Sequence, residues 1–195
     1  KEKYKKLAEY IVRLISDDPL APKESIHTIL YRIKDESRLI EKIDQENKRP
    51  ELDVTPITHK NFHERIGDII GIRIICLRLS DIVKVEAYLE FLVEENIFKF
   101  IQEPDYKRSF VLPIDPGKSA PQNINLQYSG YSSIHYQVKL GENSDASSEF
   151  KRIQIELQLR TILEEAWGEI DHKYRYAYSR IGDTLPEHIH SGFYN

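Results

Sequence analysis

A short run of alternating residues carries the side chains best suited to chemistry. The segment RIQIELQLRT (152–161) places Gln154, Glu156, Gln158 and Arg160 between isoleucines and leucines. A period of two is typical of a half-buried β-strand, so one strand face would carry carboxylate, amide and guanidinium groups. Solvated strand faces more often carry Thr, Lys or Ser, and the pattern therefore indicates the floor of a polar site. A charged outer face of an antiparallel sheet fits the alternation equally well.

The rest of the chain must supply the elements that hold this strand in place. Helical apolar spacing occurs in four regions, 1–15, 25–43, 79–96 and 163–176. Strands are expected over 69–77, 132–140 and 151–159, and strand or irregular structure is expected over 98–112. The turn-rich segment 113–130 is expected to be mobile when no ligand is bound. A buried strand followed by a covering helix implies layered packing of helices on a sheet.

Composition limits the class of protein. The 195 residues are 40% hydrophobic, enough for a sizeable core in one domain with a helical appendage. We divide the chain into an N-terminal helical segment (1–24), a main domain (25–180) and a tail or truncated extension (181–195). Apolar runs such as IIGIRIIC are too short to span a bilayer, and we expect a cytoplasmic protein with no membrane contact. The chain contains no Met, which suggests a piece of a longer protein.

Charge, cysteine content and glycine motifs narrow the function. A net charge of −4 argues against a protein that coats nucleic acid indiscriminately, yet it leaves room for a local basic pocket. The single Cys76 lies in an apolar run, which predicts a buried structural thiol and a reducing compartment. Neither a G-x-x-x-x-G-K-S/T loop nor a G-x-G-x-x-G motif occurs, so P-loop kinases and dinucleotide-binding enzymes are poor candidates.

Four short motifs in order carry a resemblance. They are RIK at 32–34 with Lys42, GDIIGIR at 67–73, SGYSSIH at 129–135, and IELQLRT at 155–161 followed by AWGEIDHKYRY. Together they span about residues 25–178, and in this order the chain resembles the RelA/SpoT family of alarmone synthetases. The resemblance implies an α+β fold, a nucleotidyltransferase-like mixed β-sheet packed with helices. It also implies transfer of pyrophosphate from ATP to the 3′-hydroxyl of GDP or GTP, which makes (p)ppGpp. Larger members add a hydrolase domain with metal-binding His and Asp residues, and since the pair Asp171–His172 has no such companions, we expect synthesis without hydrolysis.

The resemblance implies two catalytic carboxylates. Asp68 stands before the expected buried strand and is implied to be the primary Mg²⁺ ligand. Glu156 is implied to be the second Mg²⁺ ligand or the acceptor of the 3′-hydroxyl proton. Two carboxylates suffice, because magnesium keeps waters and phosphate oxygens in its octahedron. Taken alone, Asp68 would be a helix or turn cap and Glu156 a surface charge.

Four cations match the ATP-binding residues of the family. Arg32 and Arg73 are implied to sandwich the adenine between their guanidinium planes, a contact that lysine cannot make. Lys34 and Lys42 match phosphate-binding lysines of the family. Eight residues apart, they would lie about two turns apart on one face of the predicted helix 25–43. A solvated lysine face is the alternative.

The acceptor nucleotide is implied to meet a second group of residues. Tyr131 matches the aromatic residue that stacks on the acceptor base, and His135 a histidine near the acceptor phosphates. Gln158 is assigned to a ribose or phosphate contact, and Arg160 to a phosphate or to the structure of the site. Glu165 stands where several small members carry an Asn that reads guanine, and a carboxylate could accept from both N1–H and N2–H of that base.

Two further departures from the family bear on these assignments. Many members carry a lysine shortly before the Gly-Tyr motif, whereas this chain has none between Lys118 and Lys139. Lys118 or Lys107 is the candidate replacement at the acceptor phosphates. Arg38 takes the position of a usual Ser. Trp167 follows the motif strand and is expected in the core.

Three functions remain open from the sequence. The first is a monofunctional synthetase that uses ATP and GDP or GTP. The second is a toxic relative that pyrophosphorylates an adenine nucleotide or the 3′ end of tRNA, favoured by the missing lysine and by a basic N-terminal helix. The third is a catalytically silent module, which the presence of Asp68 and Glu156 argues against. Assembly into a homo-oligomer is left open.

Overall fold

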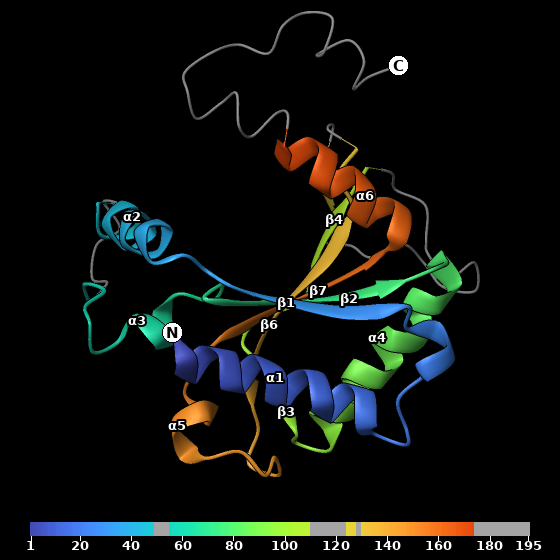
Figure 1. Cartoon of the computed structure of the whole chain (residues 1–195), viewed down its shortest axis with the longest axis horizontal. Helices are drawn as coiled ribbons and strands as arrows, with labels where there is room; N and C mark the ends of the chain where they lie inside the picture. The colour runs from blue at the N-terminus through green and yellow to red at the C-terminus, as the bar shows by residue number, and fades with distance from the viewer. Residues whose placement is uncertain (49–54, 110–123, 128–129, 174–195) are drawn as a thin grey trace, which may run out of the picture.

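A seven-stranded mixed sheet organises the chain (Figure 1). The computed structural model describes residues 1–48, 55–109, 124–127 and 130–173. The strands are β1 (Thr28–Ile33), β2 (Ile70–Cys76), β3 (Phe98–Phe100), β4 (Asp105–Arg108), β5 (Ile124–Leu126), β6 (Ser133–Leu140) and β7 (Ile155–Thr161). Their order is β1-β2-β7-β6-β4-β5, with β3 paired to β6. The central pair β2–β7 is parallel and its neighbours are antiparallel, which confirms the expected mixed sheet.

Helices lie on both faces of this sheet (Figure 1). They are α1 (Glu2–Asp17), the 3₁₀ turn η1 (Lys23–Ser25), α2 (Glu36–Asn47), α3 (Phe62–Arg65), α4 (Leu79–Glu94), α5 (Ser148–Lys151) and α6 (Ile162–Asp171). Helices α1 and α4 lie on one face, α6 lies on the opposite face, and α2 stands beyond one end of β1. In the described parts of the chain, helix α6 covers part of the face opposite α1 and α4.

The main core lies between the sheet and helices α1 and α4. Leu7, Ile11 and Ile15 of α1 are fully buried in the same cluster as the apolar faces of β2, β6 and β7. The boundary expected at residue 24 therefore does not separate two cores, because the amphipathic stripe of α1 needs the sheet to bury it. Cys76 lies in this core, and burial raises the pKa of its thiol to about 12, in agreement with the predicted structural role.

The helix expected over 25–43 is wrong in its first half. Residues Thr28–Ile33 form strand β1, which pairs antiparallel with β2, and the helix begins only at Glu36. The segment TILYRI is rich in β-branched and aromatic residues, and the exposed hydrogen-bonding edge of β2 gives it a partner. Asp35 then caps α2, because its carboxylate accepts a hydrogen bond from the N–H of Ser37 at 3.1 Å.

The boundaries of the other helices and strands differ less from those expected from the sequence. The strand expected over 151–159 runs instead over Ile155–Thr161, because Ser148–Lys151 forms the short helix α5. Two short strands, β3 and β4, lie within 98–112, and the segment expected to be mobile contains β5. Strands β2 and β6 and helix α4 are confirmed. Residues 174–176 of the expected last helix and the tail 181–195 lie outside the described residues. Along the described ranges, no helix has the length and apolar character needed to cross a bilayer.

Candidate active site

The polar face of the sheet lies opposite α1 and α4. In the parallel pair β2–β7, Gly71 lies opposite Glu156 and Arg73 opposite Gln158, so alternate residues of both strands share this face. The predicted polar row is present, but Gln158 is only 6% exposed and Arg160 only 3%. The alternative of a charged, solvated outer face is therefore wrong. These side chains belong to a buried polar network.

Helix α6 is held over the polar face by its first turn. The hydroxyl of Thr161 accepts from the N–H of Glu164 at 3.3 Å, and the Glu164 carboxylate accepts from the N–H of Thr161 at 2.7 Å. The other oxygen of Glu164 accepts from the buried guanidinium of Arg108 on β4 at 3.2 Å. This contact ties α6 to the sheet, so that the following residues of the helix face the polar row.

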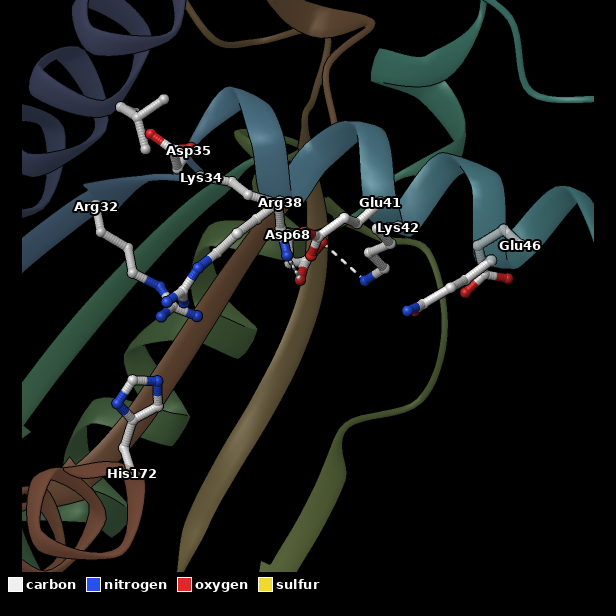
Figure 2. Close-up of a pocket in the computed structure, with 11 residues that line it drawn as sticks. Arg32, Lys34, Asp35, Arg38, Glu41, Lys42, Glu46, Asp68 and His172 are labelled. Carbon is white, nitrogen blue, oxygen red and sulfur yellow. Dashed lines mark hydrogen bonds and ion pairs between the residues drawn. The ribbon is translucent and has the colours of Figure 1, made fainter. Parts of the chain in front are cut away.

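Asp68 lies two residues before β2 and is held by two lysines (Figure 2). Its carboxylate oxygens contact Lys34 Nζ at 2.6 Å and Lys42 Nζ at 2.8 Å. Burial alone would raise the pKa of Asp68, but the hydrogen bonds from both lysines outweigh it and lower that pKa below its usual value. The prediction that both lysines lie on one helical face is wrong, since Lys34 precedes α2 and Lys42 lies within it. They nevertheless converge on one carboxylate.

A cavity of about 790 Å³, the larger cavity, opens beside the Asp68 carboxylate. Its volume is in the range of small-molecule sites. Its lining includes Arg32, Lys34, Arg38, Lys42, Asp68 and His172 (Figure 2). Two of these residues, Arg38 on α2 and His172 at the end of α6, were not among the predicted site residues. The signals that could have found them were the departure from the usual Ser at Arg38 and the motif position of His172.

A smaller cavity of about 240 Å³ joins the two predicted catalytic carboxylates. Asp68 and Glu156 both line it, and Lys42 lines both cavities. The negative charge of Asp68 acts against ionisation of Glu156, although other neighbours lower the pKa of Glu156 overall. The parallel pairing of β2 with β7 is what brings these residues together from positions far apart in the chain.

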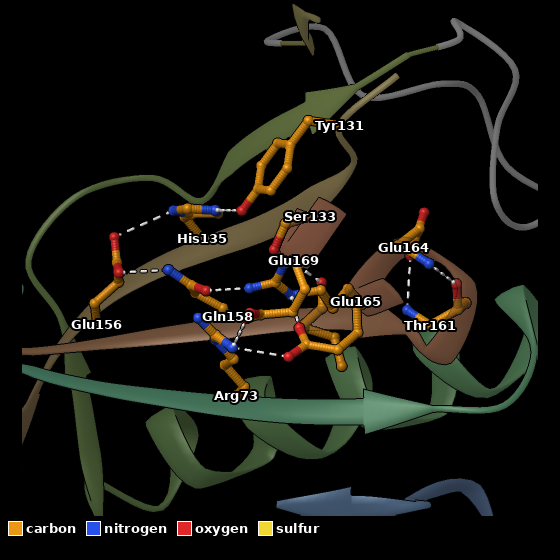
Figure 3. A network of polar contacts seen from close by, with 12 residues as sticks. Arg73, Tyr131, Ser133, His135, Glu156, Gln158, Thr161, Glu164, Glu165 and Glu169 are labelled. Carbon is orange, nitrogen blue, oxygen red and sulfur yellow. Dashed lines mark hydrogen bonds and ion pairs between the residues drawn. The ribbon is translucent and has the colours of Figure 1, made fainter. Parts of the chain in front are cut away.

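Glu156 is oriented by neighbours on the same face (Figure 3). One carboxylate oxygen lies 3.2 Å from His135 Nδ1, and the other accepts a hydrogen bond from Gln158 Nε2 at 2.6 Å. Burial acts to raise the pKa of Glu156, but these two neighbours lower it below its usual value. The hydroxyl of Tyr131 lies 3.1 Å from the other ring nitrogen of His135. A neutral His135 with its proton on Nδ1 would donate to Glu156 and accept from Tyr131.

Gly130 packs against Trp167 immediately before Tyr131. Gly130 has φ of +82°, and a Cβ at this position would lie 2.8 Å from Nε1 of Trp167. The turn before β6 therefore requires glycine at this position, because any side chain would collide with the indole and would also be strained at a positive φ. Trp167 is half-buried against this glycine, so the expectation that it belongs to the core is wrong. The guanidinium carbon of Arg160 lies 5.6 Å from the centroid of the Tyr131 ring.

The predicted adenine-binding arginines lie on one face of the sheet. Arg32 on β1 is opposite Gly71, which precedes Arg73 by two residues on β2. A Cβ at Gly71 would lie 3.2 Å from Arg32 Nε, so the Arg32 side chain crosses above this glycine. Arg73 is 20% exposed at its side chain, whereas Arg32 is exposed and lines the larger cavity.

Helix α6 places two carboxylates against Arg73 (Figure 3). Nη1 of Arg73 donates to Glu165 at 2.8 Å and to Glu169 at 2.7 Å. The second oxygen of Glu165 lies 3.1 Å from Nε of Arg160. Both carboxylate oxygens of Glu165 therefore face guanidinium groups, and the predicted reading of guanine by Glu165 does not fit this arrangement.

One of the two candidate replacement lysines lies on the polar face. Lys107 on β4 is opposite Ser133, two residues from His135 on β6, and its Nζ lies 3.7 Å from the Asp105 carboxylate. Lys118 lies outside the described residues. Lys107 is thus placed beside the residue that is expected to approach the acceptor phosphates.

Comparisons with known proteins identify relatives. Residues 31–181 match a family described as "Region found in RelA / SpoT proteins". The chain is 27% identical over 133 residues to GTP pyrophosphokinase YwaC of Bacillus subtilis, covering 68% of this chain and 52% of that protein. It is 29% identical over 126 residues to GTP pyrophosphokinase YjbM of the same organism, covering 65% and 48%. The chain thus spans about half the length of these curated relatives.

A solved structure shares the fold. Small alarmone synthetase 1 from Bacillus subtilis, bound to its product pppGpp, superposes with a TM-score of 0.61 at 20% identity. The match covers 98% of this chain and 84% of that one. The similarity confirms the architecture expected from the sequence, with helices packed on a mixed sheet.

Proposed function

The chain belongs to the RelA/SpoT family, and from this premise we propose that it transfers pyrophosphate from ATP to the 3′-hydroxyl of GDP or GTP, making (p)ppGpp. The observation that carries the proposal is the meeting of Asp68 and Glu156 at one cavity, beside a larger cavity lined by cations. The names of the Bacillus subtilis relatives, GTP pyrophosphokinases, and the pppGpp bound to a protein of the same fold support the same reaction.

The larger cavity is the proposed ATP site. Lys34 and Lys42 would bind the triphosphate, and Arg38 would add a third cation from α2. The planes of Arg32 and Arg73 would hold the adenine, since both side chains rise from the same sheet face. In the present structure the two lysines neutralise Asp68. A bound triphosphate competes for these lysines and so frees the Asp68 carboxylate.

The residues at the smaller cavity fit a magnesium ion. Asp68 would be its primary ligand, and Glu156, which lines the same cavity, would be either the second ligand or the proton acceptor. A divalent cation would offset the negative charge that these carboxylates bring to the cavity. Within the described parts of the chain, no group of three or more His, Cys, Asp or Glu that could hold a metal is present. Two carboxylates match the preference of magnesium for keeping waters and phosphate oxygens among its ligands. When bound, magnesium neutralises charge on the phosphate oxygens of the transferred group.

Glu156 is the proposed proton acceptor. The 3′-oxygen of the acceptor attacks the β-phosphorus of ATP, the bond from that phosphorus to the α-phosphate oxygen breaks, and AMP leaves. The 3′-hydroxyl proton passes to Glu156, whose depressed pKa keeps it ionised and whose two oxygens are oriented by His135 and Gln158.

The acceptor nucleotide is proposed to lie along β6 and β4. Its base would stack on Tyr131, with His135 and Lys107 near its phosphates. Gln158 would contact the ribose or a phosphate. Arg160, which is buried beneath Tyr131 and contacts Gln158, is assigned to the structure of the site.

The proposed reaction is tested with purified protein, magnesium and ATP labelled in its β- or γ-phosphate. GDP, GTP, ADP, ATP and bulk tRNA serve as separate acceptors, and AMP release and the labelled product are measured. We expect label on a guanine nucleotide with one AMP per transfer. Label on tRNA or on an adenine nucleotide would reassign the acceptor, and no AMP with any acceptor would contradict the proposed reaction.

Arg73→Lys is expected to weaken ATP binding although it conserves charge. A lysine can keep one ion pair with Glu165 or Glu169, but it has no planar face for the adenine. The loss is expected to be about tenfold in Kd, the order of a desolvated cation–π contact. Calorimetric titration with an α,β-methylene analogue of ATP measures it. Arg13→Lys, on the exposed side of α1, is the matched control. An ATP affinity equal to that of the wild type would contradict stacking on Arg73.

A further inference from the structure

Glu165 bridges two arginines, Arg73 and Arg160, that belong to different parts of the proposed site. Figure 3 shows the contact of Glu165 with Arg73. One carboxylate oxygen accepts from Arg73 Nη1 at 2.8 Å, and the other lies 3.1 Å from Arg160 Nε. The Glu165 side chain is 14% exposed and Arg160 is 3% exposed, so water screens this contact weakly. The position of one guanidinium therefore constrains the position of the other through a single carboxylate.

The two arginines face different substrates. Arg73 lies on β2, on the side proposed for the adenine of ATP. Arg160 lies on β7, with its guanidinium carbon 5.6 Å from the centroid of the Tyr131 ring, where the acceptor base is proposed to stack. Arg160 also donates to Gln158, which donates to Glu156. The contacts of Glu165 thus connect the ATP side of the site with both the acceptor side and the catalytic carboxylate.

We propose that Glu165 is a positioning residue that couples the two substrates, so that ATP and the acceptor nucleotide each bind more tightly when the other is present. This inference rests on the proposed function. Adenine stacked on Arg73 would fix the position of that guanidinium. Glu165, which contacts Arg73, would then be fixed as well, and through Glu165 so would Arg160 beneath Tyr131. The second nucleotide would meet side chains that are already ordered, and the ordering cost would not be repeated.

Glu165→Gln isolates this bridge. The amide of glutamine is close to the carboxylate in size, but it offers one acceptor oxygen and one donor nitrogen. With the side chain in the same position, its oxygen would face one of the two guanidinium groups and its –NH2 group, which cannot accept, would face the other. The variant should therefore uncouple the two sites without emptying either of them.

Glu169→Gln is the matched control. Glu169 lies one helical turn after Glu165 and accepts from the same Nη1 of Arg73 at 2.7 Å. Among the described residues, Glu169 forms an ion pair with Arg73 and not with Arg160, and its side chain is 60% exposed. Its replacement removes a charge beside Arg73 and leaves the Glu165 bridge in place, so the coupling between the two substrates should remain.

Calorimetry on the whole chain measures the coupling directly. In the presence of magnesium, the α,β-methylene analogue of ATP is titrated alone and at saturating GDP, and GDP is titrated alone and at saturating analogue. We expect the wild type to bind each ligand about tenfold more tightly with the other present, within the usual range of coupling between sites. The same factor must appear from either direction. Glu165→Gln should reduce it to below about twofold, whereas Glu169→Gln should keep it.

The outcomes separate the coupling from the proposed function. A wild type that binds neither nucleotide would reject the proposed function and the coupling with it. A wild type that binds both without mutual enhancement, or an enhancement that survives in Glu165→Gln, would reject the coupling alone. Circular dichroism checks the fold of each variant. If Glu165→Gln does not fold, Glu165→Asp serves instead, because its shorter side chain keeps the charge but cannot span both arginines.

Discussion

Glu156→Gln is expected to lower kcat for pyrophosphate transfer by about 10³-fold, in the range found when a general base is removed. The amide cannot accept the 3′-hydroxyl proton, and it is a poorer ligand for magnesium than a carboxylate. The glutamine has nearly the same size and remains within reach of Gln158, so the network around it should keep its packing. The expectation that this carboxylate faces solvent is corrected by the structure, since its side chain is only 13% exposed.

Steady-state rates of AMP release, measured at saturating ATP and GDP, provide the test of Glu156→Gln. Glu142→Gln is the control, because its carboxylate is 85% exposed and lies outside both cavities. Circular dichroism should show the same secondary structure in both variants and in the wild type. Retention of more than a tenth of the wild-type kcat would remove Glu156 from its proposed role.

Asp68→Asn is expected to have the second large effect, a loss of about 10²-fold or more in kcat/KM with magnesium. An amide is a much weaker magnesium ligand than a carboxylate, so half-saturation should require more of the metal. The substitution also frees Lys34 and Lys42 from their ion pairs with Asp68. We therefore expect the variant to bind ATP in EDTA at least as tightly as the wild type, although it has lost its turnover.

The test of Asp68→Asn needs two measurements on one preparation. Turnover is followed across a magnesium titration, and ATP binding is measured in EDTA by calorimetry. Asp44→Asn, an exposed carboxylate on α2, is the matched control and should resemble the wild type in both. A variant with normal turnover would exclude Asp68 as a metal ligand. A variant that no longer binds ATP in EDTA would show instead that Asp68 mainly shapes the pocket.

Local pattern was enough to place the central strands and their two faces. The alternation in 152–161 predicted that isoleucine and leucine would be buried while the polar row pointed to a site, and Ile155, Leu157 and Leu159 are indeed fully buried. Such a period is set by backbone geometry within one strand and does not depend on the neighbour. The resemblance then indicated which polar residues to consider, and the parallel pairing of β2 with β7 brings Asp68 and Glu156 to one cavity.

The sequence pattern could not decide features that depend on a residue far away in the chain. TILYRI became a strand because the edge of β2 was available, and spacing at i and i+4 for Ile29 and Ile33 is compatible with either structure. The role of Glu165 changed because Arg73, 92 positions away, and Arg160 both reach its carboxylate. Ion pairs and hydrogen bonds of this kind form between elements that only the tertiary fold brings together. Residue type and spacing therefore determined which groups could act, whereas chain packing decided which groups meet.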